Sequence, residues 1–135
     1  MTDFRWEEKL TPEQYGEFHA FYSKEWWTRE RSFEDVVHML SHCDVLVFCF
    51  DDADKIAGFA RVLSDFTFKA MIFDVIVSDH HRGRGLGQAI VNRVLGHEKL
   101  QRVKSFELYC PDRLVPFYEK IGFVKGTSSL LFNQS

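Results

Sequence analysis

Residues 82–87 form a glycine-rich segment with two arginines, Arg-Gly-Arg-Gly-Leu-Gly. The three glycines free the backbone to turn sharply, so that its N–H groups can point outward. A helix that begins here adds unpaired N–H donors and the positive end of its dipole. Together with the arginines, these donors predict a cradle for a phosphate or pyrophosphate group. The alternative is an ordinary tight turn with solvated arginines, and neither a G-x-G-x-x-G nor a G-K-S/T pattern is present.

A single carboxylate stands in the apolar run from Ala70 to Val77. Burying Asp74 without a partner is costly, so we expect it to be paired, hydrogen-bonded or exposed to a wet cavity. One interpretation is a structural ion pair with a nearby lysine or arginine. The other is an anionic site that draws in a cationic amine and helps to deprotonate it.

Tyr118 lies on the apolar face of a predicted helix, together with Leu114, Phe117 and Ile121 at the spacing i, i+3, i+4, i+7. Judged by this position alone, its ring is predicted to pack in the core. The phenol hydroxyl is also a candidate proton donor, because a positioned acid speeds the expulsion of a poor leaving group.

The histidines and cysteines have mainly structural interpretations. His80 and His81 are predicted to be solvated in the connection after the apolar run. Cys43, Cys49 and Cys110 are odd in number and lack the spacing of metal ligands, which indicates free buried thiols in a reducing cytoplasm and no metal site. A nucleophilic Cys110 is disfavoured, because an amine can attack a thioester without a covalent enzyme intermediate.

The composition is that of one soluble globular domain covering residues 1–135, with 45% hydrophobic and 27% charged residues. The net charge of −3 argues against a nucleic-acid partner. We find no N-terminal signal pattern and no apolar run near the roughly 18 residues that a membrane span needs. We therefore expect a cytoplasmic protein with neither a nucleic-acid nor a membrane partner, and a homodimer stays open alongside a monomer.

A buried strand and an amphipathic helix are predicted on either side of the glycine-rich segment. Residues 71–77 are apolar and rich in β-branched side chains, which is typical of a strand covered on both faces. After the glycines, one face of the helix is mostly apolar; its residues are Leu86, Ala89, Ile90, Arg93, Val94 and His97.

Strands and helices alternate along the rest of the chain, which predicts a mixed α/β sheet with about four helices. A strand is expected at 3–9, and a helix begins at Thr11-Pro12 with Tyr15, Phe18, His19, Tyr22 and Trp26 on one face. A second helix begins at Ser32, and a hairpin joins 45–50 to 56–62. A strand at 103–110, a helix from 111 to Gly122, and one more strand or small hairpin complete the prediction.

Three groups of residues resemble the small GNAT N-acetyltransferases, both bacterial members and the plant serotonin type, over about residues 45–124. They are Ser64-Asp65 with Ala70, Ile72, Asp74-Val75 and Val77; then Arg82-Gly-Arg-Gly-Leu-Gly87; then Phe117-Tyr-Glu-Lys-Ile-Gly-Phe123. The resemblance implies the GNAT acyl-CoA N-acyltransferase fold, with acetyl-CoA as co-substrate. One departure is Cys110-Pro111-Asp112, which stands where many relatives place an asparagine that contacts the CoA arm.

The resemblance also assigns roles to particular residues. Tyr118 becomes the general acid for the leaving thiolate; the role of Asp74 in assisting the amine comes instead from its place in the apolar run. The backbone of the strand at 71–77 would pair with the pantetheine arm of CoA, and the glycine-rich segment 82–87 would hold the pyrophosphate. The segment 24–31, which contains two tryptophans, would cover the acceptor. These cofactor-binding residues are Val75, Ile76, Val77, Arg82, Gly83, Arg84, Gly85, Leu86, Gly87, Gln88 and Phe117, and the acceptor-binding residues are Trp26, Trp27, Arg31 and Asp74.

The predicted activity is transfer of an acetyl group from acetyl-CoA to a primary amine of a small molecule. The amine would attack the thioester directly in a ternary complex, and strand N–H groups would stabilise the oxyanion. One alternative is an acetyltransferase acting on protein lysines or N-termini. Another is a non-catalytic acyl-CoA-binding module on the same fold, because a fold does not determine function.

Overall fold

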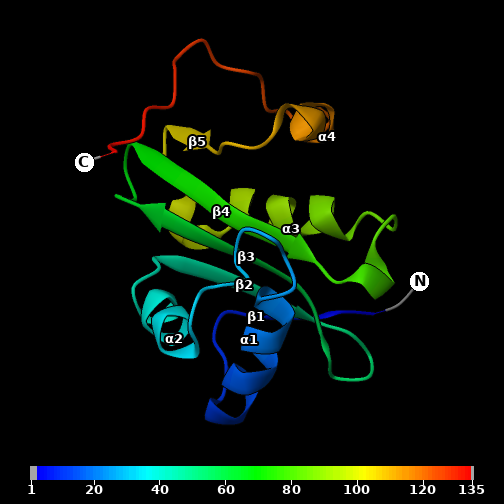
Figure 1. Cartoon of the computed structure of the whole chain (residues 1–135). Helices are drawn as coiled ribbons and strands as arrows, with labels where there is room; N and C mark the ends of the chain where they lie inside the picture. Colours follow the sequence, from blue (N-terminus) through cyan, green and yellow to red (C-terminus); the bar gives the residue numbers. More distant parts are fainter. Residues whose placement is uncertain (1–2, 135) are drawn as a thin grey trace.

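Five strands form one mixed sheet within residues 3–134, which are the residues that the structure, a computed structural model, describes (Figure 1). The sheet order is β1-β2-β3-β4-β5, and only the last pair, β4 and β5, is parallel. The strands are β1 (Arg5–Glu7), β2 (Val45–Phe50), β3 (Ile56–Ser64), β4 (Lys69–Val77) and β5 (Ser105–Glu107); the α-helices are α1 (Tyr15–Tyr22), α2 (Phe33–Ser41), α3 (Leu86–Leu95) and α4 (Val115–Glu119); the 3-10 helices are η1 (Pro12–Gln14), η2 (Asp79–His81), η3 (Glu98–Leu100) and η4 (Asp112–Leu114). The predicted mixed α/β sheet with about four helices is confirmed.

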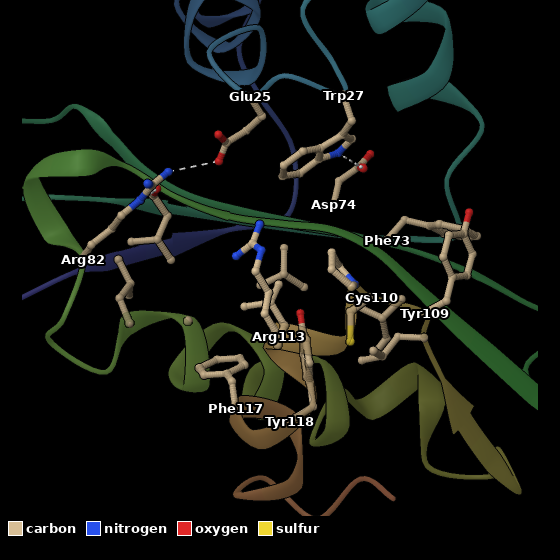
Figure 2. Close-up of a pocket in the computed structure, with 18 of the residues that line it drawn as sticks. Glu25, Trp27, Phe73, Asp74, Arg82, Tyr109, Cys110, Arg113, Phe117 and Tyr118 are labelled. Atoms are coloured by element: carbon tan, nitrogen blue, oxygen red, sulfur yellow. Dashed lines mark hydrogen bonds and ion pairs between the residues drawn. The ribbon is translucent and has the colours of Figure 1, made fainter. Parts of the chain in front are cut away.

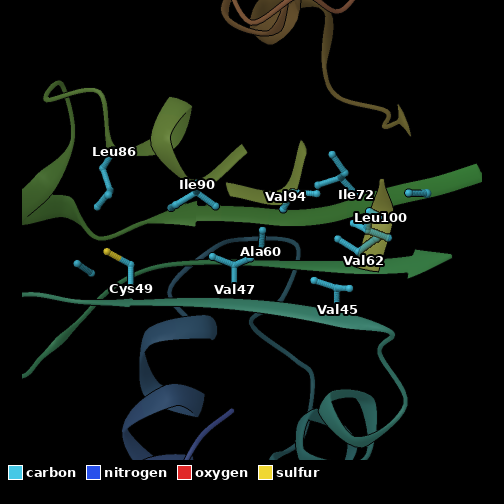
Figure 3. Close-up of a cluster of buried hydrophobic side chains, with 12 residues drawn as sticks. Val45, Val47, Cys49, Ala60, Val62, Ile72, Leu86, Ile90, Val94 and Leu100 are labelled. Carbon is cyan, nitrogen blue, oxygen red and sulfur yellow. The ribbon is translucent and has the colours of Figure 1, made fainter. Parts of the chain in front are cut away.

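Helix α3 covers one face of the sheet, while α1 and α2 cover the other (Figure 1). On the α3 face, Leu86, Ile90 and Val94 pack on small and branched strand residues (Figure 3). On the opposite face the core is aromatic, and the rings of Phe18 and Phe59 meet edge to face at 4.7 Å between centroids. Strand β4 contributes side chains to both of these cores and is therefore held from both faces of the sheet.

A β-bulge in β4 changes the direction in which its side chains face. The register between β3 and β4 shifts by one residue between Phe59 and Arg61. Asp74 lies in this bulge with a φ of 56°, in the left-handed region that few residues other than glycine adopt. Ile72 is buried on the α3 face, whereas Ile76 is buried on the α1 face, although regular alternation would put both on one face.

Helix α1 ends earlier than the sequence predicts. The buried hydroxyl of Thr28 donates a hydrogen bond to the Tyr22 carbonyl, so the chain folds back after the last turn of the helix. Trp26 was predicted to continue the apolar helix face, but it lies in this turn and is 72% exposed. The segment 23–31 is therefore a loop.

The last strand and the C-terminal segment also differ from the prediction. β5 is three residues long rather than the expected eight, because β4 and β5 pair only over Lys69–Met71 and separate before the bulge. Residues 123–134 contain no strand. None of the helices formed by the described residues combines the length and the apolar character that crossing a membrane would require.

Candidate functional site

A cavity of about 930 Å³ lies where β4 separates from the chain that follows β5 (Figure 2). Among the described residues, β4 has no strand on that side after Met71. The second half of β4, the chain from Leu108 to Tyr118, the glycine-rich loop and the loop after α1 line the cavity. The predicted covering of both faces holds here, because Val75 and Val77 pack against the core on the α3 face and Ile76 is buried on the α1 face; the open side is the edge of the strand.

The glycine-rich loop opens α3 in the way that the sequence predicts. Gly83 and Gly85 have φ values of 78° and 80°, and Gly85 is the residue that precedes the first turn of α3. A Cβ atom on Gly85 would meet nothing within 4 Å, so this glycine serves the backbone conformation and leaves open space beside it. At Gly87 a Cβ atom would lie 3.1 Å from Cζ of Phe117, so this glycine serves close packing of α3 against α4.

Arg82 ties the loop to two other parts of the cavity wall. Its Nε donates to the Val77 carbonyl at 3.1 Å, and its Nη2 donates to Oε1 of Glu25 at 3.0 Å. A third contact joins Nη1 to Asp79 at 3.2 Å. The guanidinium thus bridges the end of β4 and the loop after α1 (Figure 2).

Tyr118 is buried in the cavity wall and its hydroxyl is directed into the cavity, close to Cys110 (Figure 2). Burial raises the pKa of this phenol to about 12, with a smaller contribution from Cys110. The rings of Phe117 and Phe123 pack edge-on against Tyr118, at 4.9 and 5.9 Å between centroids. The side chain is therefore both packed as a core residue, as its helix position predicts, and placed at the cavity.

Asp74 is surrounded by hydrogen-bond donors. Its Oδ2 accepts from Arg61 Nε at 2.6 Å and from Tyr22 Oη at 2.7 Å, and its Oδ1 accepts from Trp27 Nε1 at 3.2 Å (Figure 2 shows the contact with Trp27). Arg31 Nη1 lies 3.6 Å from Oδ2. Burial alone would raise the pKa of Asp74, but the hydrogen bonds from Arg61 and Tyr22 outweigh it and lower the pKa below its usual value.

These contacts supply the ion pair that the structural interpretation of Asp74 required. Arg61 is the one charged residue of β3, as Asp74 is the one central charge in β4. Two such charges in neighbouring apolar runs are a signal from which the pair could have been predicted. Burial also raises the pKa of Tyr22, by a larger amount than the hydrogen bond to Asp74 does.

The cavity brings together most of the predicted site residues, namely Trp26, Trp27, Arg31, Asp74, Val75, Val77, Arg82, Gly83, Gly85, Leu86, Gly87, Phe117 and Tyr118. Ile76 packs instead among the aromatic residues on the α1 face. Arg84 and Gln88 are exposed and lie outside the cavity lining. Their roles in cofactor binding stay predictions.

Several lining residues were not identified from the sequence. They are Glu25, Arg61, Ile72, Phe73, His81, Leu108, Tyr109, Cys110, Pro111, Arg113 and Leu114. The side chain of Arg113 extends from η4 across the cavity toward β4 (Figure 2). Apart from Ile72, Cys110 and Pro111, which belong to the segments compared in the family resemblance, no motif marks these residues, because they come from separate elements that only the fold brings together.

His81 corrects the prediction of a solvated histidine pair. His80 is exposed, but the His81 side chain is only 11% exposed and its Nδ1 lies 2.7 Å from the Ser78 hydroxyl. Its Nε2 lies 3.5 Å from Oδ2 of Asp51. The histidine therefore fastens the start of the glycine-rich loop to the hairpin turn between β2 and β3.

The three cysteines are free thiols, as predicted, but only Cys49 is buried. Burial raises the pKa of the Cys110 thiol, and Asp112 adds to this effect. A raised pKa keeps the thiol protonated and makes it a weaker nucleophile. No group of three or more His, Cys, Asp or Glu side chains within residues 3–134 is placed to hold a metal ion.

Comparisons with known proteins agree with this arrangement. The chain matches the family model described as acetyltransferase (GNAT) domain over residues 7–134. It is 35% identical over 104 residues to the chloroplastic serotonin N-acetyltransferase 2 of Oryza sativa subsp. japonica, covering 74% of this chain and 52% of that protein. The chain spans about half the length of the curated relatives it matches, 58%, 43% and 52% for the first three.

Solved structures share the fold over nearly the whole chain. A protein of the GNAT family from Xanthomonas campestris pv. campestris superposes with a TM-score of 0.80 and 28% identity, covering 93% of this chain and 87% of that one. The aminoglycoside N-acetyltransferase AAC(6')-Iy in complex with CoA superposes with a TM-score of 0.80, covering 99% of this chain and 96% of that one. At 9% identity, the second likeness is one of fold alone.

Proposed function

This chain belongs to the GNAT acetyltransferase family, and we propose that it transfers an acetyl group from acetyl-CoA to the primary amine of a small molecule. The observation that carries the proposal is the cavity between β4 and the chain after β5. One wall offers strand backbone without a strand partner, and the other offers a protonated phenol. An acyl thioester and an amine can meet between these walls without any covalent enzyme intermediate.

The donor side of the cavity fits coenzyme A. The edge of β4 after Met71 offers backbone donors and acceptors to an amide-containing arm, as an added strand would. The open space at Gly85 and the first N–H groups of α3 suit a phosphate group. Arg113 supplies positive charge to that path, while Arg82 is already ion-paired with Glu25 and Asp79 and holds the loop in place.

Acetyl-CoA supplies the thioester that the amine attacks. In the proposed mechanism, backbone N–H groups of β4 beside the bulge stabilise the negative charge that develops on the carbonyl oxygen. Tyr118 donates its hydroxyl proton to the leaving sulfur, and its pKa of about 12 keeps it protonated in the physiological range.

Asp74 and the loop after α1 form the proposed acceptor side. Because its pKa is lowered, Asp74 stays ionised and is a poor proton acceptor itself. We assign it the positioning of the amine and the relay of a proton through water. Trp27, held by its hydrogen bond to Asp74, and the exposed Trp26 would flank the acceptor.

The experiment is a thiol-release assay with acetyl-CoA and pools of small amines, with the products identified by mass spectrometry. We expect thiol release to depend on the amine and an acetylated amine to appear in the product. Pools of lysine peptides and free N-terminal peptides form separate arms. Preferential acetylation of either peptide arm would overturn the small-molecule assignment. CoA binding without turnover in any arm would mean a non-catalytic binding module.

In this proposal residues 1–135 act as one catalytic domain in the cytoplasm, as a monomer or a homodimer. The continuous sheet from β1 to β5 supports the single domain. Sedimentation of the purified chain measures the oligomeric state directly.

A further inference from the structure

The acceptor side of the cavity has more positive charge than its one carboxylate can neutralise. Arg31 and Arg61 both lie within 4.0 Å of the same oxygen of Asp74, at 3.6 and 2.6 Å. The side chains of Asp74 and Arg61 are 7% and 15% exposed, whereas that of Arg31 is 42% exposed. The buried pair accounts for one charge of each sign, so the charge of Arg31 remains, on a partly exposed side chain that lines the cavity.

Arg31 also has donors left for a ligand. Its contacts with Tyr22 Oη and Asp74 are both made by Nη1. Among the described residues no hydrogen bond of its Nε or Nη2 is found. Arg31 also lines a second cavity of about 300 Å³ together with Arg61 and Asp35. A planar guanidinium with donors on one edge matches a carboxylate or a phosphate, which it can bind through two parallel hydrogen bonds.

The positive charge of Arg31 is not explained by the phosphates of CoA, because their proposed site lies at the other end of the cavity. Arg82 stands at the loop end of the cavity with Glu25, and Asp74 stands at the other end beneath Trp27 (Figure 2). Arg31 is at the Asp74 end, away from the glycine-rich loop. Arg31 therefore lines the part of the cavity that is assigned to the acceptor.

We propose that the amine acceptor of this enzyme carries an anionic group, a carboxylate or a phosphate, and that Arg31 binds that group. The inference rests on the proposed function, whose acceptor class it narrows. Asp74 Oδ1 accepts one hydrogen bond, from Trp27, and has room for another from the amine. An acceptor with charges of both signs satisfies Asp74 and Arg31 together, whereas a purely cationic amine meets an uncompensated arginine.

The test uses matched pairs of acceptors in the thiol-release assay. Phenylalanine against phenethylamine isolates a carboxylate, and phosphoethanolamine against ethanolamine isolates a phosphate. We expect kcat/KM to be at least tenfold higher for the anionic member of one pair, and that pair identifies the group. In the Arg31→Gln variant this preference should disappear through a higher KM, with kcat changed less, and Arg31→Lys should restore part of it.

Arg29→Gln is the matched control, because Arg29 is exposed in the same loop and does not line the cavity. Its preference should equal that of the wild type. Equal or better turnover of the cationic members by the wild type would overturn this inference and leave the proposed function standing. Absence of turnover with every amine, while CoA binding is measured by calorimetry, would overturn the proposed function and this inference with it.

Discussion

The two sides of the cavity are built in different ways. The donor side consists mainly of backbone and glycines that follow one another in the chain, from β4 through the loop 82–87 into α3, with Arg113 and Tyr118 added from η4 and α4. The acceptor side consists of side chains from α1, the loop after it, β3 and β4, which meet at Asp74. The donor side is therefore formed by a local conformation, while the acceptor side exists only when the whole fold is in place.

This difference predicts how each side responds to substitution. On the donor side, a change should alter ligand affinity or the chemical step and leave the fold largely intact. On the acceptor side, the same groups that would bind the amine also hold α1, the loop and the sheet together. On the donor side, a substitution should therefore change function without changing stability. On the acceptor side, a substitution should change both.

The largest effect is expected for Asp74→Asn. Removing this charge leaves Arg61 nearly buried without its partner, and breaking such a pair costs about 3–5 kcal/mol of unfolding free energy. Chemical denaturation measures the loss. Glu107→Gln is the matched control, because its ion pair with Lys69 at 2.7 Å is exposed and should contribute far less to stability.

The same variant has a pH signature. Because the pKa of Asp74 is lowered in the folded state, its stabilisation is present above about pH 4, the usual value, and is lost as pH falls through the lowered pKa. The stability difference between wild type and Asp74→Asn should therefore shrink in acid. A constant difference across this range would show that the stabilisation does not come from the ionised Asp74. Unchanged stability with a lower kcat/KM for the amine would show that Asp74 acts in catalysis rather than in the fold.

Tyr118→Phe should separate chemistry from binding on the donor side. The ring stays packed against Phe117 and Phe123, and only the hydroxyl is lost. We expect kcat to fall on the order of 10²-fold, as for a lost general acid, with little change in CoA affinity. Tyr109→Phe, a change at a more exposed tyrosine of the same cavity, should turn over normally.

The pH profile of the wild type adds a second check on Tyr118. With a pKa of about 12, its ionisation should not lower kcat anywhere between pH 7 and pH 10. Normal turnover by Tyr118→Phe would mean that Tyr118 is a core residue and that another group donates the proton.

Gly87→Ala is expected to have a small effect. The added methyl group would lie 3.1 Å from the Phe117 ring, which must move slightly to make room, and such overpacking costs about 1 kcal/mol. Gly126→Ala is the control, because nothing lies within 4 Å of a Cβ atom there. A thermal melt compares the two. If the two alanine variants melt alike, close packing of α3 on α4 is not the role of Gly87.

The same contrast explains what could be predicted from the sequence. The loop 82–87 was predicted because its glycines, its arginines and the helix after it are contiguous in the sequence. Side-chain alternation, by contrast, would have placed Asp74 on the α3 face with Ile72. The bulge, which no residue type in the sequence predicts, turns the Asp74 side chain to the opposite face of the sheet, where Tyr22 lies.

Other parts of the fold depended on contacts distant in sequence. Thr28 bends the chain after α1 by donating to the Tyr22 carbonyl, and this removed Trp26 from the predicted helix face. The early separation of β4 from β5 shortened the last strand and opened the cavity. Arg113 enters that cavity from η4, which the sequence marks only as the start of a helix.

The most direct test of the donor site compares two variants at one position. Asparagine and aspartate have nearly the same shape, and both tolerate the left-handed conformation that Gly85 adopts with a φ of 80°. Calorimetry with CoA should show Gly85→Asp binding at least tenfold more weakly than Gly85→Asn, about 1.4 kcal/mol, because only the aspartate repels phosphate. Equal affinities in two folded variants would contradict a phosphate site at this loop.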